Sequence, residues 1–533
     1  MKQTHSLPRA AFPEEVGVSS AAVGAFLDDI ERNLPGLHSF MVLRHGKVAA
    51  ECWRAPFTAD TPHAMYSVSK SVTSAALGIA VGEGLLSLDD KVKDFFPEEC
   101  LHRRDKNLEL LTVRHLIGMQ SGKNPGILTD RTKGRWIRDF FNAPWVAKPG
   151  TAYRYISENT FMVCAILTRV TGVCVRDYLQ PRLFDPMGIE RPFWETDNYG
   201  VEAGGWGLYL KTEDLAKFML CLHQDGVFEG KQLIPADYVK LAASNLTDNS
   251  TNTQPDFRAG YGLGFWQSRD LPGFRADGMF SQFGVVFKEY DAILIATGGV
   301  PLEQAALDCI RRHFPAAFTT PADKTENASL PERLSRAKAE PEPPVSPASP
   351  LQRRLEGKTV RFRRKVFLNL IGFPLSVLPL AVTFMTTDKA GNIDNVRFTF
   401  DETFLRMQWT EGDETNTVTC GTNGRYCYGK IRLGGVIYKV CCHAVWQADD
   451  RLTVYVRPIE TVGSRSLAFR FLPDNRVRMK PASTPTVKEI VPYLQVCFND
   501  TNHFVPLQKA AGAVMRLFPA IVEPTHCGRI VKE

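Results

Sequence analysis

The chain has 533 residues, with 64 Lys and Arg against 58 Asp and Glu, and a formal net charge of +6. Hydrophobic residues make up 44% and charged residues 23%, ordinary values that exclude wholesale disorder and fibrous structure. The length predicts roughly two to four domains, and so mild a positive charge gives no reason to expect a nucleic-acid partner.

The first 315 or so residues predict strands at both ends and a helical block between them. Apolar periodicity predicts helices over residues 19–33, 67–82, 113–119, 160–171, 212–225 and 302–313. Strands are expected over residues 37–43, 47–53, 260–267, 282–288 and 292–298. Strands from the two ends could pair in one sheet, with the helical block as an insertion and a cleft between them. The prediction is a domain over residues 1–318.

A change of composition separates this region from the rest of the chain. Residues 340–350 are rich in proline and can bury little, which predicts a semi-extended linker over residues 319–356. From residue 357 to 533 short strands alternate with turn signals, at 396–400, 405–409, 430–433, 436–440, 452–457 and 467–471. This pattern predicts an all-β barrel or sandwich, and residues 505–518 predict a terminal helix.

One stretch of the second region is apolar enough to be weighed as a membrane span. Residues 366–385 follow a basic cluster, but Pro374 and Pro379 interrupt them, which favours two buried strands over a span. The N-terminus has no apolar signal-peptide core. A cytoplasmic location without membrane contact is therefore expected.

Cysteine and histidine spacing gives no metal site. The 12 cysteines include no C-x-x-C pair, and the nearest candidates are Cys420 with Cys427, and Cys441 and Cys442 with His443. Buried free thiols explain these better than zinc. Neither a metal nor a cofactor is predicted.

The main chemical signal is the pair Ser67 and Lys70. A spacing of three residues puts both side chains on one face of a helix. A serine hydroxyl needs a base to become a nucleophile, and a lysine in a dry cleft can be that base. Ser67 also stands where the helix begins, where free N–H groups favour a developing oxyanion. The S-x-x-K pattern alone is weak evidence for a catalytic site, because Ser335 and Lys338 repeat it by chance in the linker. The apolar residues that follow Ser67 indicate a buried helix rather than a solvated face.

Two later segments could complete this site. Tyr155 and Ser157 follow the turn Pro149-Gly150, and a phenol beside a lysine can shuttle protons. Asp277, Gly278 and Phe280 enter a strand, where Gly278 permits close backbone approach and an N–H could be a second oxyanion donor. Taken singly, a residue such as Tyr155 is more often a core tyrosine, and a segment such as the one around Gly278 is more often an ordinary hairpin.

The ordered set of segments resembles the serine β-lactamase and penicillin-binding-protein-like hydrolase superfamily, nearest to the branch of class C β-lactamases, D,D-carboxypeptidases, esterases and 6-aminohexanoate-dimer hydrolases. The matching segments lie at residues 66–70, 83–91, 116–122, 149–155, 204–218, 225–231 and 261–266. The resemblance implies an α/β (α+β) domain in which an antiparallel sheet is flanked by helices and carries a helical subdomain.

The resemblance also implies roles. Ser67 would be the acylated nucleophile, Lys70 its base and Tyr155 the proton relay. The N–H groups of Ser67 and Phe280 would form the oxyanion hole, lined by Gly278.

Two positions depart from the family pattern. Ser157 stands where the family often has asparagine, although some relatives also carry serine there. Asp277 stands where the third motif has a Lys or His, unless the alignment of this motif is displaced. A carboxylate there would repel a substrate carboxylate, which disfavours β-lactams and leaves neutral or amine-bearing esters and amides.

The leading hypothesis is a serine hydrolase that cleaves a small ester, amide or peptide through a Ser67 acyl-enzyme. The alternative is a non-hydrolytic homologue that binds or senses an acyl or peptide ligand. G-x-S-x-G and H-E-x-x-H are both absent, which argues against an α/β-hydrolase and a zinc hydrolase. The sequence does not name the substrate, whose selectivity would lie in residues 123–148 and 238–258. It leaves open whether the C-terminal domain caps the cleft, binds a partner or makes a homodimer.

Overall fold

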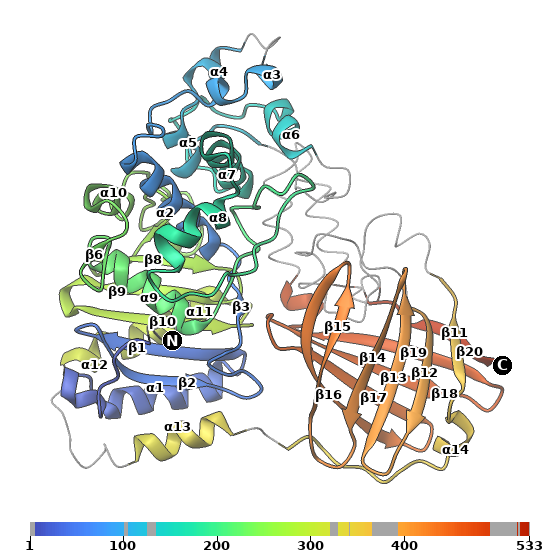
Figure 1. Cartoon of the computed structure of the whole chain (residues 1–533). Helices are drawn as coiled ribbons and strands as arrows, with labels where there is room; N and C mark the ends of the chain where they lie inside the picture. Colours follow the sequence, from blue (N-terminus) through green and yellow to red (C-terminus); the bar gives the residue numbers. More distant parts are fainter. Residues whose placement is uncertain are drawn as a thin grey trace. The chain divides into compact units, whose positions relative to one another are not determined.

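The structure is a computed structural model that describes residues 6–100, 105–124, 135–319, 329–339, 342–364, 393–490, 517, 520 and 523–531. The chain divides into two compact units, Met1–Ala339 and Glu340–Glu533 (Figure 1). Each unit has a hydrophobic core of its own, and each is described here by itself.

The first unit is built on an antiparallel sheet of six strands in the order β2-β1-β10-β9-β8-β7. The strands are β1 (Leu37–Arg44), β2 (Lys47–Trp53), β7 (Trp266–Gln267), β8 (Phe274–Gly278), β9 (Gln282–Phe287) and β10 (Ala292–Gly298). In the centre, β1 pairs with β10, so that Leu37 faces Gly298 and Arg44 faces Ala292. The prediction that strands from the two ends of this region share one sheet is confirmed.

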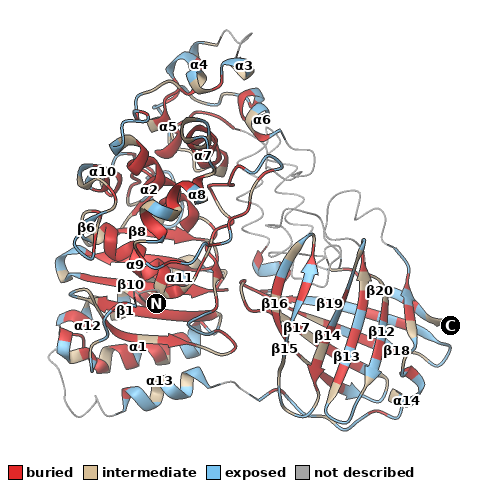
Figure 2. Ribbon diagram, in the orientation of Figure 1, coloured by how far each residue is buried: buried red, intermediate tan, exposed pale blue. Residues whose placement is uncertain are grey.

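Both faces of this sheet are buried, because its strands alternate apolar side chains between two cores (Figure 2). Phe40 and Val42 point into one core, and Met41 and Leu43 into the other. The first core is covered by α1 (Ser20–Asn33), α11 (Glu303–His313), α12 (Ala316–Thr319) and α13 (Leu330–Lys338). The second is covered by α2 (Val68–Gly82), α9 (Thr212–His223) and the helical block.

The helical block lies between β2 and β7 in the chain and forms the upper part of the first unit in Figure 1. It contains α3 (Pro97–Cys100), α4 (Lys106–Leu110), α5 (Val113–Ile117), α6 (Trp136–Asn142), α7 (Ser157–Thr171), α8 (Val175–Leu179) and α10 (Ala236–Ala242). Two short strand pairs, β3 (His63–Ala64) with β4 (Tyr209–Leu210) and β5 (Val227–Phe228) with β6 (Lys231–Gln232), accompany it. Shorter turns complete the unit: η1 (Pro13–Val16), η2 (Val92–Phe95), η3 (Gln180–Phe184), η4 (Pro255–Arg258) and η5 (Lys288–Tyr290).

One predicted strand is wrong over most of its length. Of residues 260–267, only Trp266 and Gln267 form a strand. Gly260 and Gly264 have φ values of 115° and 87°, and a Cβ on Gly262 would lie 2.0 Å from the Ala242 carbonyl oxygen. These glycines form a tight, folded segment rather than an extended one. The sequence also gave no sign of β8, the strand that carries Asp277 and Gly278.

The second unit is a closed barrel, which confirms the all-β prediction and selects the barrel over the sandwich. Within the described residues, nine strands run in the order β14-β13-β12-β11-β20-β19-β18-β17-β16, and a parallel contact between Gly421 and His443 joins β14 to β16. β15 pairs with β16 beside this closure. The elements are α14 (Gln352–Leu355), β11 (Thr359–Phe362), β12 (Ile393–Phe400), β13 (Phe404–Glu411), β14 (Glu414–Gly421), β15 (Cys427–Leu433), β16 (Val436–Ala448), β17 (Arg451–Pro458), β18 (Ser464–Phe471), β19 (Arg476–Thr484) and β20 (His526–Val531).

Alternate residues of each strand fill the barrel, as Leu405, Met407 and Trp409 do on β13. The predicted terminal helix over residues 505–518 falls almost entirely outside the described residues, as does the apolar stretch 366–385. In the described part of the chain, no single helix is long and apolar enough to cross a membrane. One bent pair of helices, Ser157–Thr171 with Val175–Phe184, is together long and apolar enough to span a membrane, by length and composition alone.

Candidate active site

The first residues of α2 stand on a strained turn. Tyr66 has a φ of 44°, a left-handed conformation that is unfavourable for a bulky residue and is often found at functional sites. Ser67 follows as the residue before the helix, so its hydroxyl lies at the helix N-terminus. The helix is buried from Val68 to Ala80 because its residues, apart from Lys70, are apolar or small on all sides.

Lys70 lies on this buried helix and is only 1% exposed. Its Nζ donates to the Ser67 Oγ at 2.8 Å, to the Ser157 Oγ at 3.0 Å and to the Gly205 carbonyl oxygen at 2.8 Å. Three oxygens from three separate segments therefore hold the ammonium over the hydroxyl of Ser67. The sequence predicted the contact with Ser67 and placed Ser157 in the same site, but not in contact with Lys70. Gly205 lies in the matching segment 204–218, without a predicted role.

Tyr155 lies beside the same ammonium, with the Lys70 Nζ 4.6 Å from the centre of its ring. Burial raises the pKa of the Tyr155 phenol, and the negative charges of Asp277 and Glu303 raise it further. Hydrogen bonding with Ser67 and Trp266 lowers the pKa of Tyr155 and so partly offsets this rise. The Trp266 ring packs against Tyr155 with centroids 5.2 Å apart, which restricts the position of the phenol.

The end of β8 passes directly beside the backbone of Ser67. A Cβ on Gly278 would lie 2.3 Å from the Met65 carbonyl oxygen and 3.2 Å from the Ser67 nitrogen. Only glycine allows this approach of the two backbones, whereas the sequence suggested glycine here for the approach of a ligand. Phe280 then turns with a φ of 64°, and its ring packs edge-on against Tyr66 at 5.4 Å.

The Phe280 N–H, one of the two predicted oxyanion donors, already has an acceptor. It donates to the Glu303 Oε1 at 3.0 Å. Glu303 is the first residue of α11, and nothing in its sequence spacing connects it with Ser67. A pattern search could not have found it, because its place depends on how α11 packs against the sheet.

Asp277 is buried and forms an ion pair with Arg275, whose Nε donates to its Oδ2 at 2.8 Å. Burial raises the pKa of the Asp277 carboxyl to about 6, against the opposing effect of Arg275. The negative charge of Asp277 reaches the phenol of Tyr155. Asp277 directly precedes Gly278, which passes beside the Ser67 backbone, although its equivalence to the family's third-motif cation stays a prediction.

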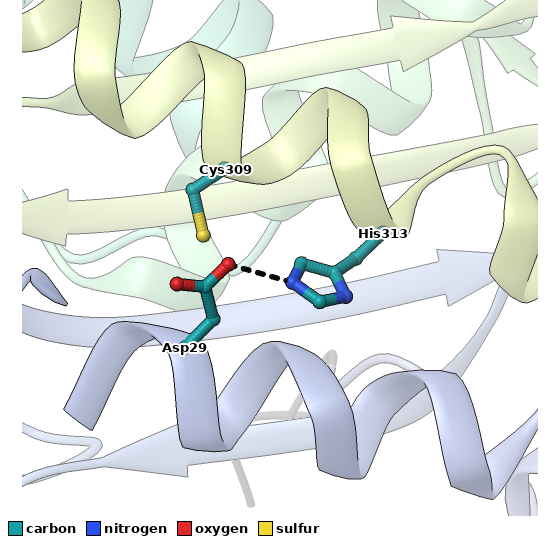
Figure 3. Close-up of side chains that lie close together, drawn as sticks. All are labelled: Asp29, Cys309 and His313. Atoms are coloured by element: carbon teal, nitrogen blue, oxygen red, sulfur yellow. Dashed lines mark hydrogen bonds and ion pairs between the residues drawn. The ribbon is translucent and has the colours of Figure 1, made fainter. Parts of the chain in front are cut away.

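One cluster of metal-ligating types lies elsewhere in the described part of the first unit. Asp29 on α1 and Cys309 and His313 on α11 place one ligand atom each within 4.8 Å of the others (Figure 3). Asp29 already accepts from Asn33, Arg312 and His313, and its pKa is lowered. Burial raises the pKa of the Cys309 thiol to about 12, so it is protonated at neutral pH. These contacts tie α1 to α11 without a metal.

The cysteines that the sequence offered as weak zinc candidates are free thiols of the barrel strands. Cys420, Cys441 and Cys442 are buried, and the ring of His443 stacks on Tyr455 at 4.3 Å.

A hollow of about 320 Å³ lies in the region that the sequence suggested for selectivity. It is lined by residues 245–248 and 258–260. The backbone of Thr247 pairs there with Tyr261, whose ring lies 6.0 Å from the ring of Tyr155.

Comparison with curated proteins finds several hydrolases. The chain is 28% identical over 248 residues to a 6-aminohexanoate-dimer hydrolase of Paenarthrobacter ureafaciens, a match that covers 43% of this chain and 63% of the relative. It is 29% identical over 187 residues to a D-aminopeptidase of Brucella anthropi, covering 32% and 35% of the two chains. It is 27% identical over 213 residues to the esterase EstB of Burkholderia gladioli, covering 34% and 54%. The matches thus span less than two thirds of these relatives' lengths.

The matched region and the site coincide. The family model for Beta-lactamase matches residues 20–302, which include Ser67, Lys70, Tyr155 and the end of β8. This region is also the one that forms the sheet and the helical block. The chain therefore belongs to the beta-lactamase family.

Proposed function

We propose that this protein is a serine hydrolase that cleaves a small ester, amide or peptide bond through an acyl-enzyme on Ser67. The observation that carries the proposal is the 2.8 Å contact between the Lys70 Nζ and the Ser67 Oγ, with the phenol of Tyr155 beside both. A nucleophile, a base and a proton relay within contact range are what acyl transfer requires.

In the proposed reaction, the neutral form of Lys70 takes the proton of Ser67 while the Oγ bonds to the substrate carbonyl carbon. The carbonyl oxygen becomes an oxyanion, which the N–H group of Ser67 stabilises, joined by that of Phe280 once it leaves the Glu303 carboxyl. The oxyanion then collapses, the bond to the leaving group breaks, and Tyr155 passes a proton to that group. Water adds to the acyl-enzyme by the reverse proton path, which releases the acid and restores Ser67.

A nitrophenyl ester of a short-chain acid tests this proposal. We expect the wild-type protein to release nitrophenol catalytically and Ser67→Ala to release none above the uncatalysed rate. Intact-mass measurement should show one added acyl group on the wild-type chain and none on Ser67→Ala. Equal release by both proteins would overturn the proposal.

A second candidate function is a homologue that binds or senses an acyl or peptide ligand without turnover. The occupied Phe280 N–H favours it, because a donor bonded to Glu303 is not free to stabilise an oxyanion. Stable acylation of Ser67 without nitrophenol release beyond one equivalent would support this second function.

A further inference from the structure

The two units of the chain differ in charge. Residues 340–533, which include the barrel, contain 26 Lys and Arg against 18 Asp and Glu, a formal charge of +8. Residues 1–339 contain 38 against 40, a formal charge of −2. The mild net charge of the whole chain therefore hides a basic second unit, and a basic unit attracts anionic partners.

Exposed cations gather on three neighbouring strands of the barrel. Alternate residues of a strand face outward, and on β19 these include Arg476, Arg478 and Lys480, all exposed. The outward residues of β20 and β11 include Arg529 and Arg361, which are also exposed. β20 lies between β19 and β11 in the sheet, so the five cations share one outer surface. These five residues are called the basic face.

The strand register places several of these cations directly opposite one another. Arg476 pairs with Arg529, and Arg529 pairs in turn with Arg361, on strands about 4.8 Å apart. On its other side, β19 places Arg478 opposite Arg470 of β18. Like charges directly opposite in an antiparallel sheet repel each other and reduce stability. An anionic partner that covers the basic face would remove this repulsion.

The carboxylates of the protein offset little of this charge. Asp474 forms an ion pair with Arg476. The other four members of the basic face form no ion pair within the residues that the structure describes. Four of the five cations are guanidinium groups, whose planar fork donates to two oxygens of one phosphate or carboxylate at once. Phosphate-bearing surfaces are therefore the partners that the basic face suits best.

The remaining outward side chains of the three strands bear on the kind of partner. They are small or aliphatic: Ala482, Thr484, Cys527, Val531 and Thr359. None of them is aromatic, whereas proteins hold single-stranded nucleic acid by stacking its bases on aromatic rings. Duplex DNA is read by a helix or ribbon that enters a groove, and the basic face is the outer surface of strands inside a sheet. A planar layer of anionic groups matches this surface better.

We propose that the basic face is a docking surface for an anionic membrane, which it contacts through the phosphate and carboxylate groups of lipid headgroups. Clusters of four to eight basic residues are typical of proteins that bind such surfaces. The sequence predicted no membrane contact and gave no sign of this face, because its cations lie in three separate segments that only the strand order brings together.

Co-sedimentation of the full chain with lipid vesicles tests the proposal. One set of vesicles contains phosphatidylcholine alone, and the other contains roughly one third phosphatidylserine. We expect the affinity for the anionic vesicles to be higher by about tenfold or more, and to fall as the salt concentration rises. Equal binding to both sets, or binding to neither, would overturn the proposal.

Removal of three cations assigns the binding to the basic face. The triple variant Arg361→Gln, Arg478→Gln and Arg529→Gln should bind anionic vesicles about a hundredfold more weakly, because each cation near such a surface contributes about fivefold. The single variant Arg529→Gln should lose about fivefold. Thermal unfolding of the triple variant should occur at the same temperature or a higher one, since it loses like-charge repulsion.

The matched control removes the same charge from another part of the barrel. Arg425, Lys430 and Arg432 are exposed residues on β15 or just before it, at the far end of the strand order from β11 and β20. Their triple replacement by Gln should weaken vesicle binding by less than about fivefold. A loss as large as that of the first triple variant would mean that net charge alone attracts the membrane, and would overturn the basic face.

Two further measurements separate this inference from its alternatives. Binding to a short duplex DNA that is tighter than binding to anionic vesicles at equal phosphate concentration, and lost in the first triple variant, would replace the membrane by nucleic acid and overturn the proposal. The inference does not depend on acyl transfer, so Ser67→Ala should bind anionic vesicles as the wild-type protein does. Ester turnover without vesicle binding would retain the proposed function and overturn the docking surface.

Discussion

Lys70 has three oxygen acceptors within 3.0 Å and is almost completely buried, so its position is fixed before a substrate arrives. Ser67 and Lys70 then work as one unit. We expect Ser67→Ala and Lys70→Ala each to remove most ester turnover, and the double variant to lose little more than either. Comparison of kcat/KM for the three variants checks this. Losses that multiply in the double variant would show that the two residues act separately.

Tyr155 packs against Trp266 and lies beside Lys70. In the proposed reaction it forms no covalent bond to the substrate and only transfers protons. Tyr155→Phe keeps the ring and removes the hydroxyl alone. We expect kcat to fall by roughly 10²–10⁴-fold, the usual contribution of a positioned proton-transfer group. The loss should be smaller for a nitrophenyl ester than for an alkyl ester, because nitrophenolate leaves without a proton. An equal loss for both esters would remove the tyrosine from leaving-group protonation.

Asp277 is a buried carboxyl close to neutral pH in its titration. Burial raises the pKa of its carboxyl to about 6, while Arg275 opposes the shift and Asp256 adds to it. Glu303 has a raised pKa as well and titrates together with Asp277. Both carboxyl groups therefore acquire their negative charge at a higher pH than exposed carboxyl groups do.

At the scale of elements, the contact between β8 and the start of α2 sets the width of the site. Gly278→Ala would place a methyl group 2.3 Å from the Met65 carbonyl oxygen, so the strand must move away from Ser67. We expect a loss of about 1–3 kcal/mol in the free energy of unfolding and a larger loss of ester turnover. Gly84→Ala is the control, since its φ of 71° is unfavourable for alanine but open space surrounds its Cβ position. It should lose stability and keep turnover.

The sequence predicted the elements whose periodicity is long and regular. Helices α1, α2 and α11 and strands β1, β2 and β10 lie within a few residues of the expected bounds. It failed at residues 260–265, where aromatic residues favoured a strand and three glycines imposed a folded segment. It also missed β8, a buried strand of five residues that contains Arg275 and Asp277 and so lacks an apolar run.

The residues of the candidate site also divide into those that the sequence could predict and those that it could not. Ser67, Lys70 and Tyr155 could be chosen from residue types and spacing, because their chemistry is local or matches an ordered set of segments. Glu303 could not, because it reaches the site through a helix packed from the far end of the unit. Gly205 lies in a matching segment, but its contact is made by a backbone carbonyl, which any residue has. Residue type carries no information about either contact.

At the scale of the whole molecule, the described groups of the site all belong to the first unit, Met1–Ala339. Helix α13 belongs to this unit too, since Leu330 is buried against α1 and Arg333 donates to the Gly24 carbonyl oxygen. We expect a chain that ends after Ala339 to remain folded and to keep ester turnover. A chain that ends after Phe318 loses the contact of Leu330, worth about 1.5–3 kcal/mol, and should unfold at a lower temperature. Thermal unfolding and turnover of both chains check this, and loss of turnover in the longer one would mean that the barrel contributes to the site.

The pairing of β1 with β10 has a consequence for how the protein is made. β1 leaves the ribosome early, but its partner strand follows about 250 residues later, a delay of roughly 10–50 s at ordinary rates of translation. Throughout that interval an apolar strand edge is open to other nascent chains. Newly synthesised protein should therefore depend on chaperones more than its finished stability suggests, and slower translation should increase aggregation in the cell.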